Sequence, residues 1–199
     1  HAEFPFPCLH PSYRPYAHQM RAFKRIAAGE STLVATGTGS GKTECFLYPI
    51  LDYCYRQRRL GLKGIKAILV YPMNALATDQ AKRLAELIHN SPELRNNVTA
   101  GMYVGQMSQG GSDKDNHAMT ATNIVTSHDE LLKNPPDILL TNYKMLDQLL
   151  LRPDDQPLWS KSALSLTYLV LDEFHTYDGA QGTDVAILLR RLGMALRSY

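Results

Sequence analysis

The chain has 199 residues, of which 44% are hydrophobic and 20% are charged, a composition that excludes a disordered, collagen-like or coiled-coil protein. Its net charge is only +2, so any site for a polyanion has to be local rather than a property of the whole surface. No apolar run approaches the roughly 18 residues that cross a bilayer, and the three cysteines form no C-x-x-C pair. We therefore expect a cytoplasmic chain of about one domain, without a membrane contact.

Predicted helices and strands alternate along the chain. Frequent prolines indicate an extended arm over 1–12, apolar spacing predicts a helix over 16–28, and 31–35 fits a short strand. The later predicted helices are 42–58, 75–89, 127–133, 143–151 and 183–197, and the later predicted strands are 65–71, 99–104, 137–141 and 166–171. Residues 105–117 are polar and glycine-rich, which is typical of a loop. This alternation predicts an α/β fold with an open, mostly parallel sheet, helices on both faces, and a ligand site at the carboxyl ends of the strands.

The strongest motif is ATGTGSGKT at residues 35–43, between a predicted strand and a predicted helix. Its glycines let backbone N–H groups converge on phosphate oxygens, and the N-terminus of the following helix adds partial positive charge. We expect Lys42 to reach the β- and γ-phosphates of ATP and the Thr43 hydroxyl to coordinate Mg²⁺. The residues expected to bind the phosphates along the turn are Thr38, Gly39, Ser40 and Gly41. The usual pattern begins with glycine where this chain has Thr36, and the alternative is a glycine-rich turn followed by Lys-Thr by chance.

A second motif, LVLDEFH at residues 169–175, places two carboxylates at the end of an apolar strand. We expect Asp172 to coordinate Mg²⁺ and Glu173 to orient and deprotonate a water molecule in line with the γ-phosphate. With Lys42, these acids form the predicted catalytic set. Adjacent acids after a strand also occur as ordinary loop residues. A small-molecule kinase needs no second carboxylate for water, so Glu173 favours hydrolysis over phosphoryl transfer.

Five segments of the chain carry a family resemblance. They are YAHQ at 16–19, ATGTGSGKT at 35–43, YPMNALATDQ at 71–80, TNYKML at 141–146 and DEFH at 172–175. In this order they resemble the first RecA-like lobe of a superfamily 2 DExH-box helicase. TNYKML and HTYDGAQGT at 175–183 are similar to the YprA-type group of DNA helicases, which includes DNA-repair helicases and large helicases of bacterial anti-phage systems. The resemblance implies a RecA-like P-loop lobe over 13–199, truncated before the Ser-Ala-Thr motif and the second lobe.

The resemblance also implies roles for single residues. Gln19 would read the adenine edge, and His175 would couple the nucleotide site to the nucleic-acid side. Contacts to the backbone of one nucleic-acid strand, DNA rather than RNA, are implied for Pro72, Met73, Asn74, Thr141 and Asn142. Such contacts position a strand without reading its sequence.

A basic cluster ends the predicted P-loop helix and continues after it. Its members are Arg56, Arg58, Arg59, Lys63 and Lys66. The end of a helix favours cations, so we expect a solvated surface here rather than a nucleic-acid contact.

The features together predict the ATP-binding lobe of an ATP-dependent DNA helicase or translocase. ATP and Mg²⁺ are the expected cofactors, and the expected partners are one strand of DNA, a second RecA-like lobe of the same protein, and further proteins. Without the arginine of a second lobe, this lobe is expected to hydrolyse ATP poorly. Two alternatives stay open. The lobe could be a nucleotide-gated scaffold of a multi-protein defence complex, or a P-loop signalling or transport ATPase that nucleic acid does not stimulate.

Overall fold

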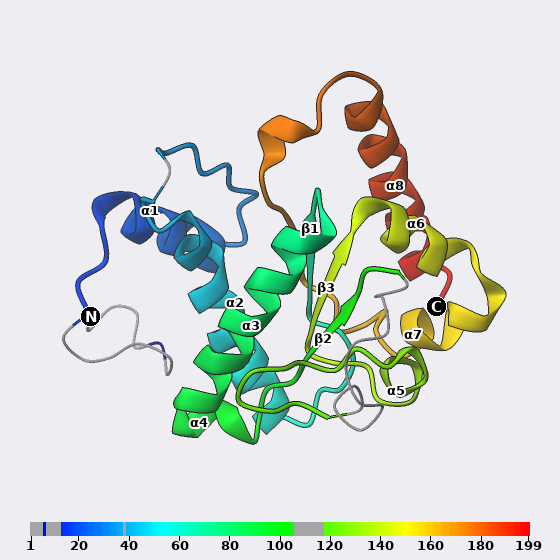
Figure 1. Ribbon diagram of the computed structural model, residues 1–199, viewed down its shortest axis with the longest axis horizontal. Helices are drawn as coiled ribbons and strands as arrows, with labels where there is room; N and C mark the ends of the chain where they lie inside the picture. Colours follow the sequence, from blue (N-terminus) through cyan, green and yellow to red (C-terminus); the bar gives the residue numbers. More distant parts are fainter. Residues whose placement is uncertain (1–5, 7–12, 38, 106–117) are drawn as a thin grey trace.

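The computed structural model describes residues 6, 13–37, 39–105 and 118–199. They form an α/β fold around one sheet of four parallel strands in the order β2-β3-β1-β4 (Figure 1). The strands are β1 (Ala67–Tyr71), β2 (Ala100–Tyr103), β3 (Ile138–Asn142) and β4 (Tyr168–Leu171). The helices are α1 (Ala17–Ala27), α2 (Lys42–Arg59), α3 (Asn74–Asn90), α4 (Pro92–Arg95), α5 (His128–Lys133), α6 (Tyr143–Leu151), α7 (Gln156–Ser160) and α8 (Gly179–Arg197), with short 3-10 turns η2 (Pro153–Asp155) and η3 (Phe174–Thr176).

The strand register aligns the carboxyl ends of all four strands at one edge of the sheet. Tyr71 lies opposite Asn142, Val70 lies opposite Leu171, and Tyr103 lies opposite Thr141. Parallel neighbours need a crossover between them, and helices supply most of these crossovers here. The segments that follow the strands therefore emerge side by side, which is where the sequence predicts the functional residues.

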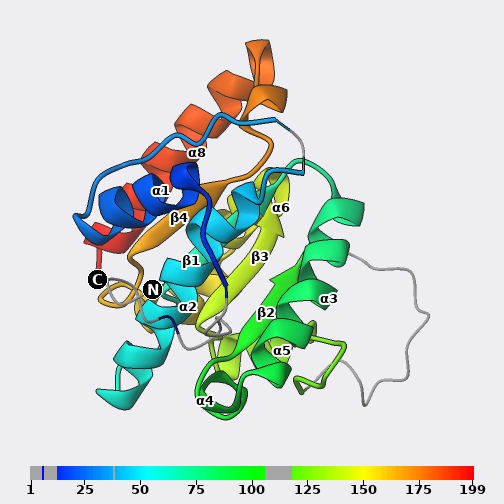
Figure 2. The same ribbon diagram turned by 90° about the vertical axis from the view of Figure 1, so that its left-hand side faces the viewer.

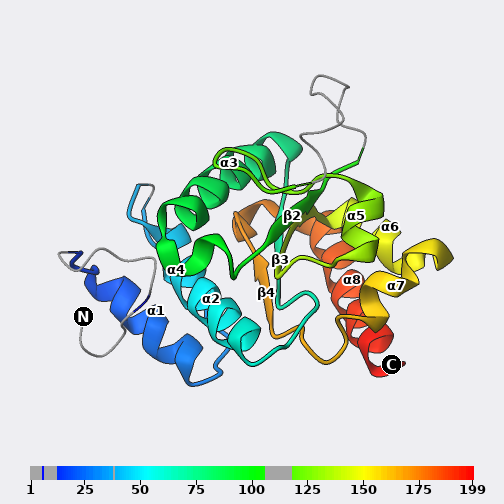
Figure 3. The same cartoon turned by 90° about the horizontal axis from the view of Figure 1, so that it is seen from below.

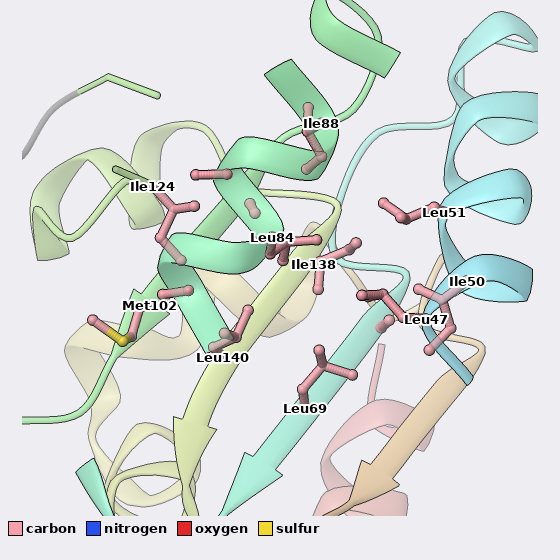
Figure 4. Packing of buried hydrophobic residues seen from close by; sticks show 14 of the residues in the cluster. Leu47, Ile50, Leu51, Leu69, Leu84, Ile88, Met102, Ile124, Ile138 and Leu140 are labelled. Atoms are coloured by element: carbon pink, nitrogen blue, oxygen red, sulfur yellow. The ribbon is translucent and has the colours of Figure 1, made fainter. Parts of the chain in front are cut away.

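Each face of the sheet has its own hydrophobic core. Figure 3 shows α1 to α4 on one side of the sheet and α5 to α8 on the other. On the first side, Leu69 and Leu140 of the strands pack against Leu47 of α2 and Leu84 of α3 (Figure 4). On the second side, Ile68 and Val70 lie among residues of α6, α7 and α8. All five residues of β1 are buried, as expected for a continuous apolar run that helices cover on both faces.

Most predicted elements are confirmed, and the ends of several are shifted. The predicted helix over 143–151 has the bounds of α6, whereas α8 already begins at Gly179 rather than at residue 183. Two short helices, α4 and α7, were not predicted, because four or five residues are too few to show an apolar period. None of the helices in the described part of the chain is long and apolar enough to cross a membrane.

The predicted strand over 31–35 is wrong. This segment pairs with no strand of the described sheet, and it connects α1 to α2 as an irregular stretch (Figure 2). Its side chains alternate between exposed and half-buried, and Leu33 is 74% exposed. An apolar alternation produces a strand only where a neighbour completes its hydrogen-bond ladder, and β4 pairs only with β1 among the described strands.

Two predictions fall mostly on residues that the structure does not describe. The arm over 1–12 is described only at Phe6, and the loop over 105–117 only at Gly105. The expectation of a solvated basic cluster is confirmed for Arg56, Arg59 and Lys63, which are exposed, and is wrong for Lys66, which is fully buried. Both Lys66 and Arg58 pair with the carboxylate of Asp137. Because Asp137 lies far from both residues in the sequence, the basic run by itself indicated only an exposed surface.

Candidate active site

The glycine-rich turn ends at the N-terminus of α2. Gly39 and Gly41 both have φ of +75°, a left-handed conformation that residues with a side chain rarely adopt. A Cβ on Gly41 would lie 2.5 Å from Nε2 of Gln19, so the site also needs the small residue sterically. A hydrogen bond of 2.6 Å between the hydroxyls of Thr36 and Ser40 closes the turn. The predicted phosphate contact of Thr38 lies outside the described residues.

Lys42 and Thr43 form the start of α2. The Lys42 ammonium donates a hydrogen bond of 3.1 Å to the carbonyl of Thr36, so the side chain folds back over the glycine-rich turn. The first backbone N–H groups of an α-helix have no partner within the helix, and they carry the positive end of its dipole. The turn, the ammonium and the helix N-terminus therefore form a positive site that suits a phosphate group.

Helix α1 is attached to the glycine-rich turn through two neighbouring residues. Nε2 of Gln19 donates to the carbonyl of Gly41 at 3.0 Å, and Nε2 of His18 lies 2.9 Å from the carbonyl of Ser40. Oε1 of Gln19 accepts from the Tyr13 hydroxyl at 2.8 Å and from the N–H of Tyr16 at 2.9 Å. The Gln19 side chain is buried, and its oxygen already accepts two hydrogen bonds, which is its full capacity.

Asp172 and Glu173 follow β4 at the carboxyl edge of the sheet. The N–H of Asp172 donates to the carbonyl of Val70 at 3.0 Å, and the N–H of Glu173 donates to Oδ1 of Asp172 at 2.9 Å. Burial raises the pKa of the Asp172 carboxyl, and the charge of Glu173 raises it further, whereas the hydrogen bond from the Glu173 N–H and the charge of Lys42 lower it. Lys42 of the glycine-rich turn is thus the one cation among the described groups that shift the pKa of Asp172.

Glu173 holds an unusual backbone conformation. Its φ is 49° and its ψ is 45°, a left-handed conformation that no other non-glycine residue in the described part of the chain adopts. The hydroxyl and the N–H of Thr176 both donate to the Glu173 carbonyl at 2.8 Å and hold the turn. Nδ1 of His175 lies 3.4 Å from the Glu173 carboxylate. Backbone strain of this kind is concentrated at functional sites.

Two asparagines join the ends of three strands. Nδ2 of Asn142 donates to Oδ1 of Asn74 at 2.6 Å, and Nδ2 of Asn74 donates to the carbonyl of Val104 at 3.1 Å. Oδ1 of Asn142 accepts from the N–H of Met145 and caps α6. Beside this pair, Met73 is exposed and Pro72 is half-buried. The asparagine pair and Met73 therefore present polar and apolar groups at the carboxyl edge.

Thr141, for which the resemblance implies a contact to a nucleic-acid strand, does not lie at the surface. Thr141 is fully buried, and its hydroxyl donates to the carbonyl of Tyr103 at 2.6 Å. Thr141 lies within β3, where helices cover both faces of the sheet. Asn142, the last residue of β3, is the first that is partly exposed.

An ion pair that the sequence analysis missed joins α2 to α3. The Glu44 carboxylate, in the first turn of α2, pairs with the guanidinium of Arg83 in α3. Oε2 of Glu44 is buried without a hydrogen-bond partner among the described residues. Glu44 directly follows Lys42 and Thr43, and this position next to the expected phosphate site could have drawn attention to it. Its partner Arg83 lies on another helix, so the ion pair is visible only in the folded chain.

Thr43 and Asp172 are the residues expected to hold Mg²⁺. No group of three or more His, Cys, Asp or Glu residues in the described part of the chain could hold a metal ion by itself. Thr43 and Asp172 offer a hydroxyl and a carboxylate, the oxygen ligands that Mg²⁺ prefers, and Mg²⁺ commonly takes its other ligands from phosphates and water. The residues present therefore fit an ion that arrives with a nucleotide.

Comparisons with known proteins show similarity over most of this chain. A family model described as DEAD/DEAH box helicase matches residues 16–198. The chain is similar to a solved structure described as the DUF1998 helicase MrfA bound to DNA and AMPPNP, with a TM-score of 0.70 and 31% identity over 92% of this chain and 22% of that chain. Related sequences include the Druantia protein DruE of Escherichia coli, which is 29% identical over 90% of this chain and 15% of its own length. The ATP-dependent helicase YprA of Bacillus subtilis is 30% identical over 92% of this chain and 21% of its own length. The chain thus spans about a fifth or less of the lengths of these relatives.

Proposed function

Because the chain belongs to the DEAD/DEAH box helicase family, we propose that it is the ATP-binding lobe of an ATP-dependent DNA helicase or translocase. One observation carries the proposal: the same lobe holds a glycine-rich turn with Lys42 folded over it at the start of α2, and a pair of carboxylates directly after β4. A phosphate site alone would suit many nucleotide-binding proteins. A second carboxylate that activates water, the role proposed for Glu173, would distinguish an ATP hydrolase.

Binding of ATP would use groups that already converge on the turn. Lys42 would exchange the Thr36 carbonyl for phosphate oxygens, and the N–H groups of Gly39 to Gly41 would donate to the same phosphates. Thr43 and Asp172 would hold Mg²⁺, which supplies positive charge against the negative charge that develops during phosphoryl transfer. For Gln19 to read the adenine edge, its oxygen has to release the Tyr13 hydroxyl or the Tyr16 N–H.

Hydrolysis would depend on Glu173. Its carboxylate would orient a water molecule and accept the proton as the water oxygen attacks the γ-phosphorus, while the bond to the β-phosphate oxygen breaks and ADP leaves. His175, whose Nδ1 lies 3.4 Å from that carboxylate, would couple it to the nucleic-acid side. An arginine from a second RecA-like lobe would complete the site, and the greater lengths of the relatives leave room for such a lobe.

The nucleic-acid strand would lie along the carboxyl edge of the sheet. Asn74 and Asn142 offer amide groups to phosphate oxygens, and Pro72 and Met73 flank them. Thr141 is fully buried inside the sheet, so the strand contact expected for it passes to Asn142. The similarity to a DNA-bound helicase structure favours DNA over RNA.

The test is the ATPase rate of the full-length protein with and without single-stranded DNA, single-stranded RNA and duplex DNA. We expect one polymer to stimulate hydrolysis. Lys42→Ala is expected to abolish ATP binding. Glu173→Gln is expected to bind ATP but lower its turnover by about 10²-fold to 10³-fold, as when a group that stabilises the transition state is removed.

Two surface variants serve as matched controls. Lys63→Ala and Glu30→Gln make the same chemical changes at exposed positions and are expected to leave the rates unchanged. Retained turnover in Glu173→Gln would remove the assigned base. A rate that none of the three polymers changes would reject the helicase proposal and support the nucleotide-gated scaffold.

A further inference from the structure

Tyr177 is a buried residue next to the acid pair that the mechanism above does not use. It follows η3 and is 7% exposed. Its hydroxyl donates a long hydrogen bond of 3.5 Å to the carbonyl of Val70, the same carbonyl that accepts the N–H of Asp172. Burial raises the pKa of the Tyr177 hydroxyl to about 12, and the Asp172 carboxylate and Tyr143 raise it too, so the hydroxyl remains a donor. Tyr177 and Asp172 thus share one acceptor, the Val70 carbonyl at the end of β1.

The Tyr177 ring also contacts the nucleic-acid side of the lobe. Its centroid lies 6.3 Å from that of Tyr143 at an interplanar angle of 87°, an edge-to-face contact. Tyr143 is the first residue of α6, directly after Asn142, which caps the helix and bonds Asn74. One aromatic contact therefore separates the asparagine pair from the segment of the acid pair.

The packing around Tyr177 limits the direction in which it can move. A Cβ on Gly182 of α8 would lie 2.8 Å from the Tyr177 carbonyl oxygen, so α8 packs closely against the Tyr177 backbone. On the side of the acids, the Tyr177 ring contacts Phe174, with centroids 6.5 Å apart, and its N–H donates to the Phe174 carbonyl. A shift of the Tyr143 ring toward Tyr177 would therefore be transmitted to η3 and to the strained backbone of Glu173.

We propose that Tyr177 is a positioning residue that aligns the Asp172–Glu173 segment when a nucleic-acid strand binds at Asn74 and Asn142, through its edge-to-face contact with Tyr143. The inference rests on the proposed function. A phosphate that takes the amide of Asn142 competes with its bond to Asn74, which alters the residue that caps α6. Tyr143 then moves with the start of the helix, and Tyr177 carries the change to the acids.

The experiment measures the ATPase rate of the full-length protein without nucleic acid and with saturating single-stranded DNA, together with its DNA affinity. In Tyr177→Leu we expect the basal rate and the DNA affinity to stay within about twofold, while the stimulation by DNA falls by about tenfold, the order of one aromatic contact. Tyr143→Leu is expected to have the same effect, and the double variant no larger one, because both remove the same contact. Tyr177→Phe keeps the ring and is expected to retain the stimulation.

Tyr53→Leu is the matched control. It removes another edge-to-face pair, between Tyr53 and Tyr168, with centroids 5.2 Å apart at the opposite end of β4. It is expected to leave the stimulation unchanged, and thermal melts of all variants verify folding. The inference is overturned if Tyr177→Leu keeps its stimulation, or if basal and stimulated rates fall in parallel. A wild-type protein that DNA does not stimulate would instead reject the proposed function, and the inference with it.

Discussion

The two ends of the sheet differ in how many hydrogen bonds their buried or half-buried carboxylates accept. At the amino end, the fully buried carboxylate of Asp137 accepts hydrogen bonds from Lys66 at 2.6 Å, from Arg58 at 2.9 Å and from the N–H of Thr99 at 2.8 Å. At the carboxyl end, the half-buried carboxylate of Asp172 accepts one hydrogen bond among the described residues.

This difference indicates that the charged groups at the amino end stabilise the fold, whereas those at the carboxyl end serve the proposed site. Paired charges at the amino end satisfy one another and specify how α2, β1 and β3 meet. At the carboxyl end, the backbone of Glu173 is strained and burial raises the pKa of the Asp172 carboxyl, and both features cost stability. A site that has to receive a ligand keeps groups that have few partners inside the chain.

The largest expected effect concerns the amino end. Asp137→Asn removes the charge that neutralises the buried ammonium of Lys66, and breaking a buried ion pair in this way costs about 3–5 kcal/mol. The free energy of unfolding from chemical denaturation measures the change. Asp172→Asn is the matched variant at the carboxyl end, where no such loss is expected. Equal losses in the two variants would contradict the comparison.

Asp172→Asn is expected to lower ATP turnover of the full-length protein by about 10²-fold or more while it stabilises the fold near neutral pH. Burial raises the pKa of Asp172, so its ionised form destabilises the folded state above that pKa. Below the pKa of an unfolded Asp, about 3.9, the carboxyl is protonated in both states and the effect disappears. Thermal midpoints of both proteins at about pH 3, below that value, and at about pH 7, above it, test the direction of the stability change. A lower midpoint for Asp172→Asn at neutral pH would contradict it.

Gly41→Ala tests the glycine-rich turn. Its φ of +75° and the 2.5 Å approach of the new Cβ to Nε2 of Gln19 predict a loss of about 1–3 kcal/mol of stability and weaker ATP binding. Gly37→Ala is the control, because a Cβ at Gly37 meets nothing within 4 Å. Melting curves and nucleotide titrations of both variants compare them. Indistinguishable variants would show that the turn does not depend on Gly41.

The smallest expected effect is a gain of stability at Glu173. Glu173→Gly relieves the left-handed backbone, whose φ is 49°, and should stabilise the fold by about 1 kcal/mol. Glu173→Ala keeps a Cβ and is expected to give no such gain. Both variants should lose turnover. If alanine stabilises the protein as much as glycine does, removal of the carboxylate rather than relief of the backbone is the cause.

Much of the fold was predictable because local patterns agree with tertiary structure over most of the chain. The continuous apolar run of β1 and the helical spacing of apolar residues in α6 both indicate the burial that the structure shows. The segment 31–35 failed because a strand needs a partner, and no pattern within five residues shows whether one is present. Lys66 was misjudged for the same reason, since its partner Asp137 lies on another part of the chain.

The order of α and β elements, the glycine-rich turn with Lys42 and the acids after β4 can all be read from the amino-acid sequence, since spacing and composition encode them locally. Which groups of these residues stay accessible depends on the folded chain. It buried the hydroxyl of Thr141 and occupied the oxygen of Gln19. It also brought Tyr143 against Tyr177. Such contacts join residues far apart in the chain, and their geometry is set by how the helices pack on the sheet rather than by any local pattern.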